Sequence, residues 1–223
     1  MLPTPDLSHL KSEDYRHVYE PAEDTFILLD ALEEDAETLR ELRPAVCVEI
    51  GSGSGCVTTF AGKILGASSS LYLTTDINPR ACATTKATGC QNTVPIEPIL
   101  ASLVGPLRAR LKHAVDLLLF NPPYVPTDAE EADAAQDDAG IAGAWAGGQD
   151  GMAITDVVLD QVENLLSPRG RFYLVAVKQN DIQGICGRML TQHGLRGEVA
   201  LQRRAGREHL YVLRFHRERP DRT

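Results

Sequence analysis

Short apolar runs alternate with longer amphipathic stretches through most of this sequence. The runs have the length and the glycine, proline or polar boundaries typical of strands, which we expect at 45–50, 71–75, 95–100, 115–120 and 171–177. The stretches between them have helical periodicity, and we expect helices at 22–42, 56–65, 79–90, 154–166 and 181–192. This alternation, with no internal repeat, predicts an α/β fold in which helices flank a mostly parallel sheet.

The end of the chain departs from this alternation. Apolar residues at 196–202 and 209–215 are separated by a charged segment, which predicts a hairpin and one antiparallel member of the sheet. The run at 115–120 is so uniformly apolar that both of its faces should be buried. Residues 121–151 are rich in proline, glycine, alanine and aspartate, which is typical of a functional loop. We expect one domain over 1–223, with an N-terminal extension at 1–18 and a frayed tail at 217–223.

The composition is that of a folded protein with little affinity for nucleic acid. Of its 223 residues, 43% are apolar and 24% are charged, which provides enough apolar surface for a buried core. The 31 acidic residues outnumber the 22 basic ones and give a formal charge of -9. No general basic surface is therefore expected to hold a phosphate backbone.

No segment predicts a membrane span, a signal peptide or a metal site. The apolar runs are too short to cross a bilayer, and Asp6, Glu13 and Asp14 stand where a signal peptide would be apolar. We therefore expect a soluble, cytoplasmic protein, with the nucleus as a second compartment. The five cysteines form no CxxC pair and no cluster with zinc spacing, so we expect reduced thiols and no metal.

A glycine-rich turn directly follows the first predicted strand. Its sequence is Glu-Ile-Gly-Ser-Gly-Ser-Gly at 49–55, and a helix is predicted after it. Glycines in such a turn let the backbone approach a ligand closely, which indicates a nucleoside cofactor. A dinucleotide site needs glycine where Cys56 stands, and a phosphate-binding P-loop needs a Gly-Lys-Ser/Thr run that is absent.

Two acidic residues narrow the choice of cofactor. Asp76 ends the next strand, where an acidic side chain accepts hydrogen bonds from ribose hydroxyls in folds of this kind. Glu49 precedes the glycines, and a carboxylate there suits a ligand with positive charge, such as a sulfonium or an ammonium. S-adenosylmethionine carries both groups, and its product after methyl transfer is S-adenosylhomocysteine.

The tetrapeptide Asn121-Pro122-Pro123-Tyr124 directly follows the apolar strand at 115–120. In open α/β sheets this position lies beside the glycine turn, at the carboxyl ends of the strands. A planar NH2 group is a weak nucleophile, so an enzyme must engage both of its N–H groups and hold the nitrogen in line with the methyl donor. The Asn121 side-chain oxygen and the Pro122 carbonyl can accept these hydrogen bonds, and Tyr124 offers a face for stacking.

Several segments together resemble one family. They are Tyr-Glu-Pro-Ala-Glu-Asp-Thr at 19–25, the turn at 49–55, Thr-Asp-Ile-Asn-Pro at 75–79, the tetrapeptide at 121–124, Ala-Trp-Ala-Gly-Gly at 144–148 and Leu-Ser-Pro-Arg-Gly at 166–170. The chain is similar over nearly its whole length to the eukaryotic and archaeal release-factor glutamine methyltransferases, the HemK-like catalytic subunits. The resemblance implies a seven-stranded, Rossmann-like class I methyltransferase sheet. It also implies S-adenosylmethionine-dependent N5-methylation of the glutamine in the Gly-Gly-Gln motif of a class 1 termination factor.

The resemblance also implies roles for individual residues by matching position. Asn121, Pro122 and Tyr124 are implied to be catalytic, and Asn121, Pro123, Tyr124 and Trp145 to bind the substrate. Ser102 stands where relatives often have an acid that contacts the adenine. The implied cofactor contacts are Tyr19, Glu20, Pro21, Thr25, Glu49, Gly51, Gly53, Gly55, Asp76, Ile77, Ser102, Leu103 and Asn121.

The strand at 95–100 is expected at a sheet edge, where Val94, Ile96 and Ile99 would be presented for strand addition. The resemblance implies that a small zinc-binding activator subunit binds this edge to form a heterodimer. Three alternative functions remain open on the sequence. They are N6-adenine DNA methylation, protein lysine methylation on histones, and a catalytically silent scaffold that binds the cofactor.

Overall fold

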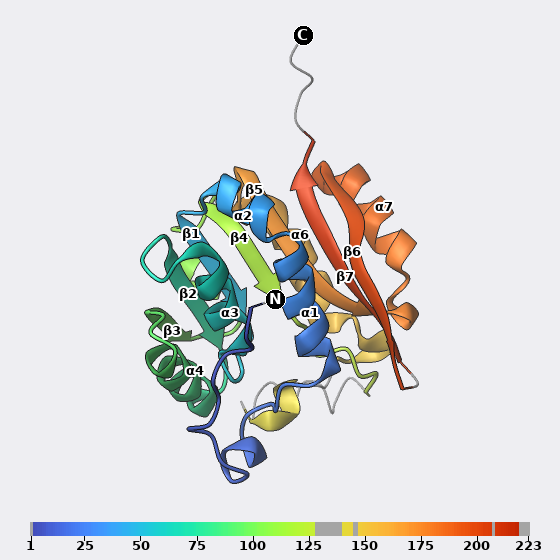
Figure 1. Ribbon diagram of the computed structural model, residues 1–223. Helices are drawn as coiled ribbons and strands as arrows, with labels where there is room; N and C mark the ends of the chain where they lie inside the picture. The colour runs from blue at the N-terminus through green and yellow to red at the C-terminus, as the bar shows by residue number, and fades with distance from the viewer. Residues whose placement is uncertain (1, 128–139, 145–146, 207, 219–223) are drawn as a thin grey trace.

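A seven-stranded sheet organises the chain, in the order β3-β2-β1-β4-β5-β7-β6 (Figure 1). The computed structural model describes residues 2–127, 140–144, 147–206 and 208–218. Pairing is parallel from β3 through β5, and β7 is antiparallel to both of its neighbours. The strands are β1 (Val46–Ile50), β2 (Leu71–Asp76), β3 (Ile96–Leu100), β4 (Val115–Phe120), β5 (Leu166–Val177), β6 (Leu195–Ala205) and β7 (Glu208–Arg217).

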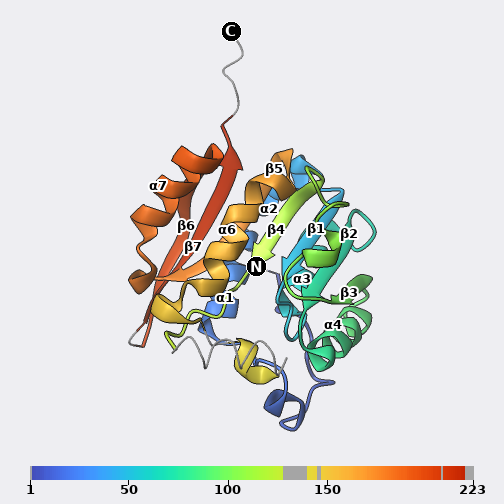
Figure 2. The same ribbon diagram turned by 180° about the vertical axis from the view of Figure 1, so that it is seen from behind.

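Helices cover both faces of this sheet. The α-helices are α1 (Glu23–Glu34), α2 (Ala36–Leu42), α3 (Cys56–Leu65), α4 (Pro79–Gln91), α6 (Ala153–Leu165) and α7 (Ile182–His193). Helices α1, α2 and α3 cover one face (Figure 1), and α6 and α7 cover the other (Figure 2). Short 3₁₀ segments are η1 (Asp14–Arg16), η2 (Gly105–Leu107), η3 (Ile141–Ala144), η4 (Gln149–Gly151) and η5 (Lys178–Asn180).

The predicted fold class is confirmed, and so is the burial of the central strand. Leu117, Leu118 and Leu119 of β4 are each at most 1% exposed, because β4 has a strand on each side and helices on both faces. The two faces have separate apolar cores. Leu117 and Leu119 belong to the core under α1 to α3, and Leu118 belongs to the core under α6 and α7. Alternate side chains of one strand thus join the two layers.

Two predicted boundaries are wrong. The helix expected at 22–42 breaks at Asp35, whose carboxylate accepts hydrogen bonds from the Tyr173 hydroxyl at 2.6 Å and from the Arg214 guanidinium. The strand expected at 171–177 instead begins at Leu166, and its first residues pair with β4 through a shift in register. Both departures depend on contacts between residues far apart in the sequence.

The N-terminal arm, residues 2–22, contacts both ends of α4 and continues into α1. The Asp6 backbone N–H donates to Asn92 Oδ1 and the Asn92 amide donates to the Asp6 carbonyl, both at 2.8 Å. Asn78 Nδ2 donates to the His17 carbonyl at 2.7 Å. Side chains at the two ends of α4 therefore fasten the N-terminal arm. Among the helices that the structure describes, none has the length and apolar character to cross a membrane.

Candidate active site

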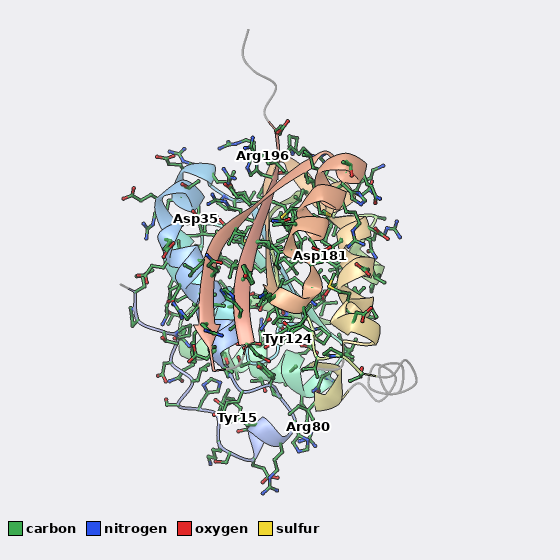
Figure 3. All side chains as sticks on the ribbon, turned by 90° about the vertical axis from the view of Figure 1, so that its right-hand side faces the viewer. Tyr15, Asp35, Arg80, Tyr124, Asp181 and Arg196 are labelled. Atoms are coloured by element: carbon green, nitrogen blue, oxygen red, sulfur yellow. The ribbon has the colours of Figure 1, made fainter. Side chains whose placement is uncertain are left out.

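A pocket lies at the carboxyl ends of β1, β2 and β4, where open α/β sheets bind their ligands. The glycine turn after β1 forms its floor, the end of β2 forms one side, and the segment after β4 forms the other. The N-terminal arm adds His17, Val18 and Tyr19, and the 3₁₀ segment η3 adds Ile141 and Ala144. Figure 3 shows Tyr124 at this end of the molecule.

Two glycines of the turn are required for different reasons. Gly51, Gly53 and Gly55 all have positive φ values, of 68°, 50° and 77°. A Cβ on Gly51 would meet no atom within 4 Å, so this position faces open space, and Gly51 lines the pocket. A Cβ on Gly55 would instead lie 2.7 Å from Thr85 Cα. Gly51 therefore keeps room for a ligand, whereas Gly55 allows α3 to pack closely against α4.

Asp76 lies at the end of β2 with its carboxylate in the pocket. It accepts hydrogen bonds from the backbone N–H groups of Gly53 and Asn78, each at 2.9 Å. Burial raises its pKa, and the backbone donors act in the opposite direction. Each carboxylate oxygen has a further lone pair, so Asp76 is held rigidly and can still accept hydroxyl groups of a ligand.

Glu49 is buried at the base of the pocket, 3% exposed. Its carboxylate accepts hydrogen bonds from the backbone N–H of Thr58, at 3.0 Å, and from the Thr58 hydroxyl. Thr58 lies in the first turn of α3, so Glu49 also satisfies a free helix N-terminal group. Burial raises the pKa of Glu49 from 4.5 to about 8, despite the two Thr58 hydrogen bonds.

This pKa predicts a pH-dependent stability. Between pH 4.5 and 8 the folded state holds a proton on Glu49 that the unfolded state releases, so the free energy of unfolding falls as pH rises. The loss attributable to Glu49 should total roughly 4 kcal/mol across that window. Urea unfolding of wild type and Glu49→Gln at several pH values measures it as a difference. Parallel curves for the two proteins would contradict the assignment.

Asp24 connects the N-terminal arm to the tetrapeptide after β4. This residue of α1 is 4% exposed, and its Oδ2 atom accepts hydrogen bonds from Tyr19 Oη and Asn121 Nδ2, both at 3.0 Å. Tyr124 Oη donates to the same oxygen at 3.4 Å. Burial and the neighbouring Asp24 charge both raise the pKa values of Tyr19 and Tyr124, which keeps the two hydroxyls protonated as donors.

The orientation of the Asn121 amide follows from this contact. Because a carboxylate only accepts hydrogen bonds, the NH2 end of Asn121 must face Asp24. The other end, Asn121 Oδ1, is buried and has no hydrogen-bond partner among the described residues, and Asn121 lines the pocket. A buried unpaired acceptor is costly, so this oxygen is suited to receive an N–H group from a bound ligand.

The structure brings most of the predicted site residues to one pocket. Those that line it are Tyr19, Thr25, Glu49, Gly51, Gly53, Asp76, Ile77, Leu103, Asn121 and Pro123. Those that do not line it are Glu20, Pro21, Gly55, Ser102, Pro122 and Tyr124. Ser102 is exposed, and the Tyr124 hydroxyl contacts Asp24. Trp145 lies outside the described residues.

Other residues of the pocket were not predicted. His17, Val18, Asn78 and Ile141 line it without belonging to a recognisable motif. The central contacts of Asp24 were also missed, although this acid lies within the 19–25 segment that the sequence singled out. An acid among the buried apolar positions of an amphipathic helix is the signal that was available for Asp24.

The fold and the pocket together define an α/β methyltransferase. A solved structure of the E. cuniculi Mtq2–Trm112 complex, responsible for methylation of the translation termination factor eRF1, aligns with a TM-score of 0.66 and 25% identity. The alignment covers 90% of this chain and 99% of that one. No family model matches the sequence.

Curated relatives identify the family. The chain is 48% identical over 214 residues to Methyltransferase HEMK2 of Mus musculus, covering 96% of each protein. It is 42% identical over 228 residues to the eRF1 methyltransferase catalytic subunit mtq2 of Schizosaccharomyces pombe, covering 97% of this chain and 96% of the relative. The chain belongs to this HemK-like family of release-factor glutamine methyltransferases.

Proposed function

We propose that this enzyme transfers a methyl group from S-adenosylmethionine to the side-chain nitrogen of glutamine in the Gly-Gly-Gln motif of a class 1 release factor. The relatives named for action on eRF1 support this proposal. The single observation that carries it is the unpaired, buried Asn121 Oδ1 in the pocket. A carboxamide NH2 has the geometry to donate to that oxygen, whereas an acceptor without an N–H group does not.

The chain's own residues prepare the acceptor amide. Asn121 Oδ1 takes one N–H, and we infer that the Pro122 carbonyl takes the other, which holds the amide plane and turns the nitrogen toward the glycine turn. Two hydrogen bonds to the N–H groups also favour the charge that develops on nitrogen as its lone pair attacks. The products are N5-methylglutamine, S-adenosylhomocysteine and the proton that the amide nitrogen releases.

The pocket residues fit the proposed cofactor. Asp76 retains lone pairs for the two ribose hydroxyls, and the space in front of Gly51 admits the amino acid portion. Burial favours the protonated form of Glu49, and the positive charges of S-adenosylmethionine would favour its carboxylate. The sulfonium of the bound cofactor would supply an activated methyl group. Leu103 and Ile77 line the pocket beside Asp76 and provide apolar contact for the adenine ring.

The glycine turn provides a matched pair of variants. Gly51→Ala should abolish measurable cofactor binding at moderate cost in stability, roughly 1 kcal/mol, because its Cβ enters the open pocket. Gly55→Ala should lower the free energy of unfolding by roughly 3 kcal/mol, because its Cβ meets Thr85 Cα in addition to the positive-φ strain. Calorimetric titration and urea unfolding separate the two effects, and equal effects of both variants would contradict these assignments.

The Mtq2–Trm112 complex supports a heterodimer for this chain as well, and we infer that a small activator subunit binds at a sheet edge. Strand β3 lies at an edge, as the sequence predicts. The expectation that Val94 and Ile96 are presented there is wrong, since they are 3% and 1% exposed and belong to the core, whereas Ile99 is partly exposed. Leu100 is instead 59% exposed and adds apolar surface at the end of this strand. A protein that is soluble, monodisperse and fully active when expressed alone would contradict this proposal.

A labelling assay tests the activity. Labelled S-adenosylmethionine is offered with a termination factor, with the same factor carrying Gln-to-Ala in its Gly-Gly-Gln loop, with duplex DNA and with histone. Label is expected only on the unmodified factor, and Asn121→Ala serves as the catalytic control. Label on DNA, on histone or on the Gln-to-Ala factor would overturn the proposal.

A further inference from the structure

A second hollow, of about 480 Å³, lies at the opposite pole of the sheet from Asn121. It lies where β5 and β6 begin and where β7 ends. Figure 3 labels Arg196 at this pole and Tyr124 at the other. The polar lining of the hollow consists of Arg169, Arg171, Arg196, His216, Arg217 and Glu218. The proposed methyl-transfer chemistry uses none of these residues.

The sheet register places three of these residues in one row. Arg171 of β5 pairs with His216 of β7, and His216 pairs with Arg196 of β6. Directly opposite residues of antiparallel neighbours point to the same face of a sheet, so the two guanidinium groups flank the histidine on one side. A bound anion can therefore pair with both guanidinium groups of this row at once.

The acids nearby neutralise this row only in part. Glu218 pairs with Arg196 at 3.5 Å, between side chains that are both more than half exposed, where an ion pair contributes little. Glu198 is shared between Arg214 at 2.9 Å and His216 at 3.6 Å.

Arg171 interacts electrostatically with Glu198, but among the described residues it forms no ion pair or side-chain hydrogen bond. Its Nε atom is buried and has no hydrogen-bond partner among the described residues. Buried donors in native proteins are nearly always paired, so this guanidinium is suited to an acceptor that is not part of the chain.

We propose that this hollow is a binding site for a polyanion that bears at least two phosphate groups. Guanidinium forks match phosphate oxygens in shape and charge. Arg217 is paired with Glu163 at 3.4 Å, and the three other arginines of the lining exceed what a single phosphate requires. The volume falls within the range of roughly 300–1,000 Å³ that is typical of small-molecule sites. Apart from Leu42, Pro168 and Gly170 the lining is polar or charged, which favours a strongly polar ligand. The arginines of the hollow form a local basic cluster on a protein whose net charge is -9.

Calorimetric titration of the full-length protein, purified with its activator subunit, tests this site. The probes are inorganic tripolyphosphate and a nucleoside triphosphate, in low-salt buffer without phosphate and with the methyltransferase pocket saturated by S-adenosylhomocysteine. Both probes should bind and should raise the thermal unfolding midpoint. Equal affinities identify the phosphate chain as the recognised group, and tighter binding of the nucleotide identifies a nucleotide as the source.

Matched variants separate this site from general charge attraction. Arg171→Gln combined with Arg196→Gln should weaken tripolyphosphate binding by at least about tenfold, since it removes two charge-assisted contacts. Arg108→Gln combined with Arg110→Gln removes the same charge from exposed positions outside the hollow and should leave the affinity nearly unchanged.

Two results would overturn the proposal. One is no binding of either probe at millimolar concentration, and the other is an equal loss of affinity in both double variants. S-adenosylhomocysteine affinity reports whether each variant is folded. If the Arg171 variant does not fold, Arg196→Gln alone decides, because its side chain is 63% exposed and its loss disturbs no core packing.

Discussion

Replacing Asn121 by alanine is expected to lower kcat for glutamine methylation by roughly 10²- to 10³-fold, the loss typical when one preorganised hydrogen-bonding group is removed. The variant loses the buried oxygen that accepts an amide N–H in the pocket. Cofactor affinity should change little, since Gly51 and Asp76 keep their positions in the pocket. Single-turnover methylation of a release factor measures the chemical step, and titration with S-adenosylhomocysteine measures the affinity.

The same experiment distinguishes a catalytic role from a structural one. Asn121 is only partly buried, and its removal leaves Asp24 with the Tyr19 and Tyr124 hydroxyls as donors. The thermal midpoint of Asn121→Ala should therefore stay close to that of wild type. A variant that keeps wild-type kcat would remove Asn121 from the proposed mechanism.

Asp24→Asn is expected to lower kcat by roughly 10²-fold without removing any atom that touches the acceptor. In wild type, Asp24 Oδ1 accepts from the Thr25 backbone N–H at 2.7 Å, and Oδ2 accepts from Asn121 Nδ2. Asparagine at this position keeps its oxygen on the Thr25 N–H and presents NH2 to Asn121. Asn121 must then turn its own oxygen toward residue 24, which directs its NH2 group into the pocket.

A double-mutant cycle tests this positioning role. If Asp24 acts through Asn121, the variant with both Asp24→Asn and Asn121→Ala should be scarcely slower than Asn121→Ala alone. Fully additive losses would contradict the argument. Asp30→Asn is the matched control, because Asp30 lies on the same helix and its only described partner is Arg203. That control should leave kcat unchanged.

Regular packing explains why so much of the fold could be predicted from sequence. A strand such as β4, with helices on both faces, requires an uninterrupted apolar run, and the run at 115–120 is visible without any knowledge of its neighbours. Likewise, Gly51 and Gly55 mark a tight turn through backbone angles that other residues rarely adopt. The break at Asp35 has no such local signal, since neither glycine nor proline is present there. Its cause lies in the distant partners Tyr173 and Arg214.

The residues of the active site likewise include some that local sequence predicts and some that it does not. Asp76 and Asn121 were predictable because each directly follows or ends a strand, and strand ends meet at one edge of a parallel sheet. The contact between Asp24 and Asn121 joins residues 97 positions apart, and nothing local reports it. The pocket wall formed by His17 and Val18 belongs to a segment without helical or strand periodicity, so its place could not be read from the pattern.

The N-terminal arm has a thermodynamic consequence for the ligand. Side-chain hydrogen bonds hold the arm in three places: Asn78 donates to the His17 carbonyl, the Tyr19 hydroxyl donates to Asp24, and Asn92, at the other end of α4, bonds Asp6. Ordering such a segment costs conformational entropy, and that cost is shared between folding and ligand binding. The dissociation constant therefore includes a contribution from residues that never touch the bound molecule, and Asn92, at the far end of α4, is coupled energetically to a ligand beside Gly51.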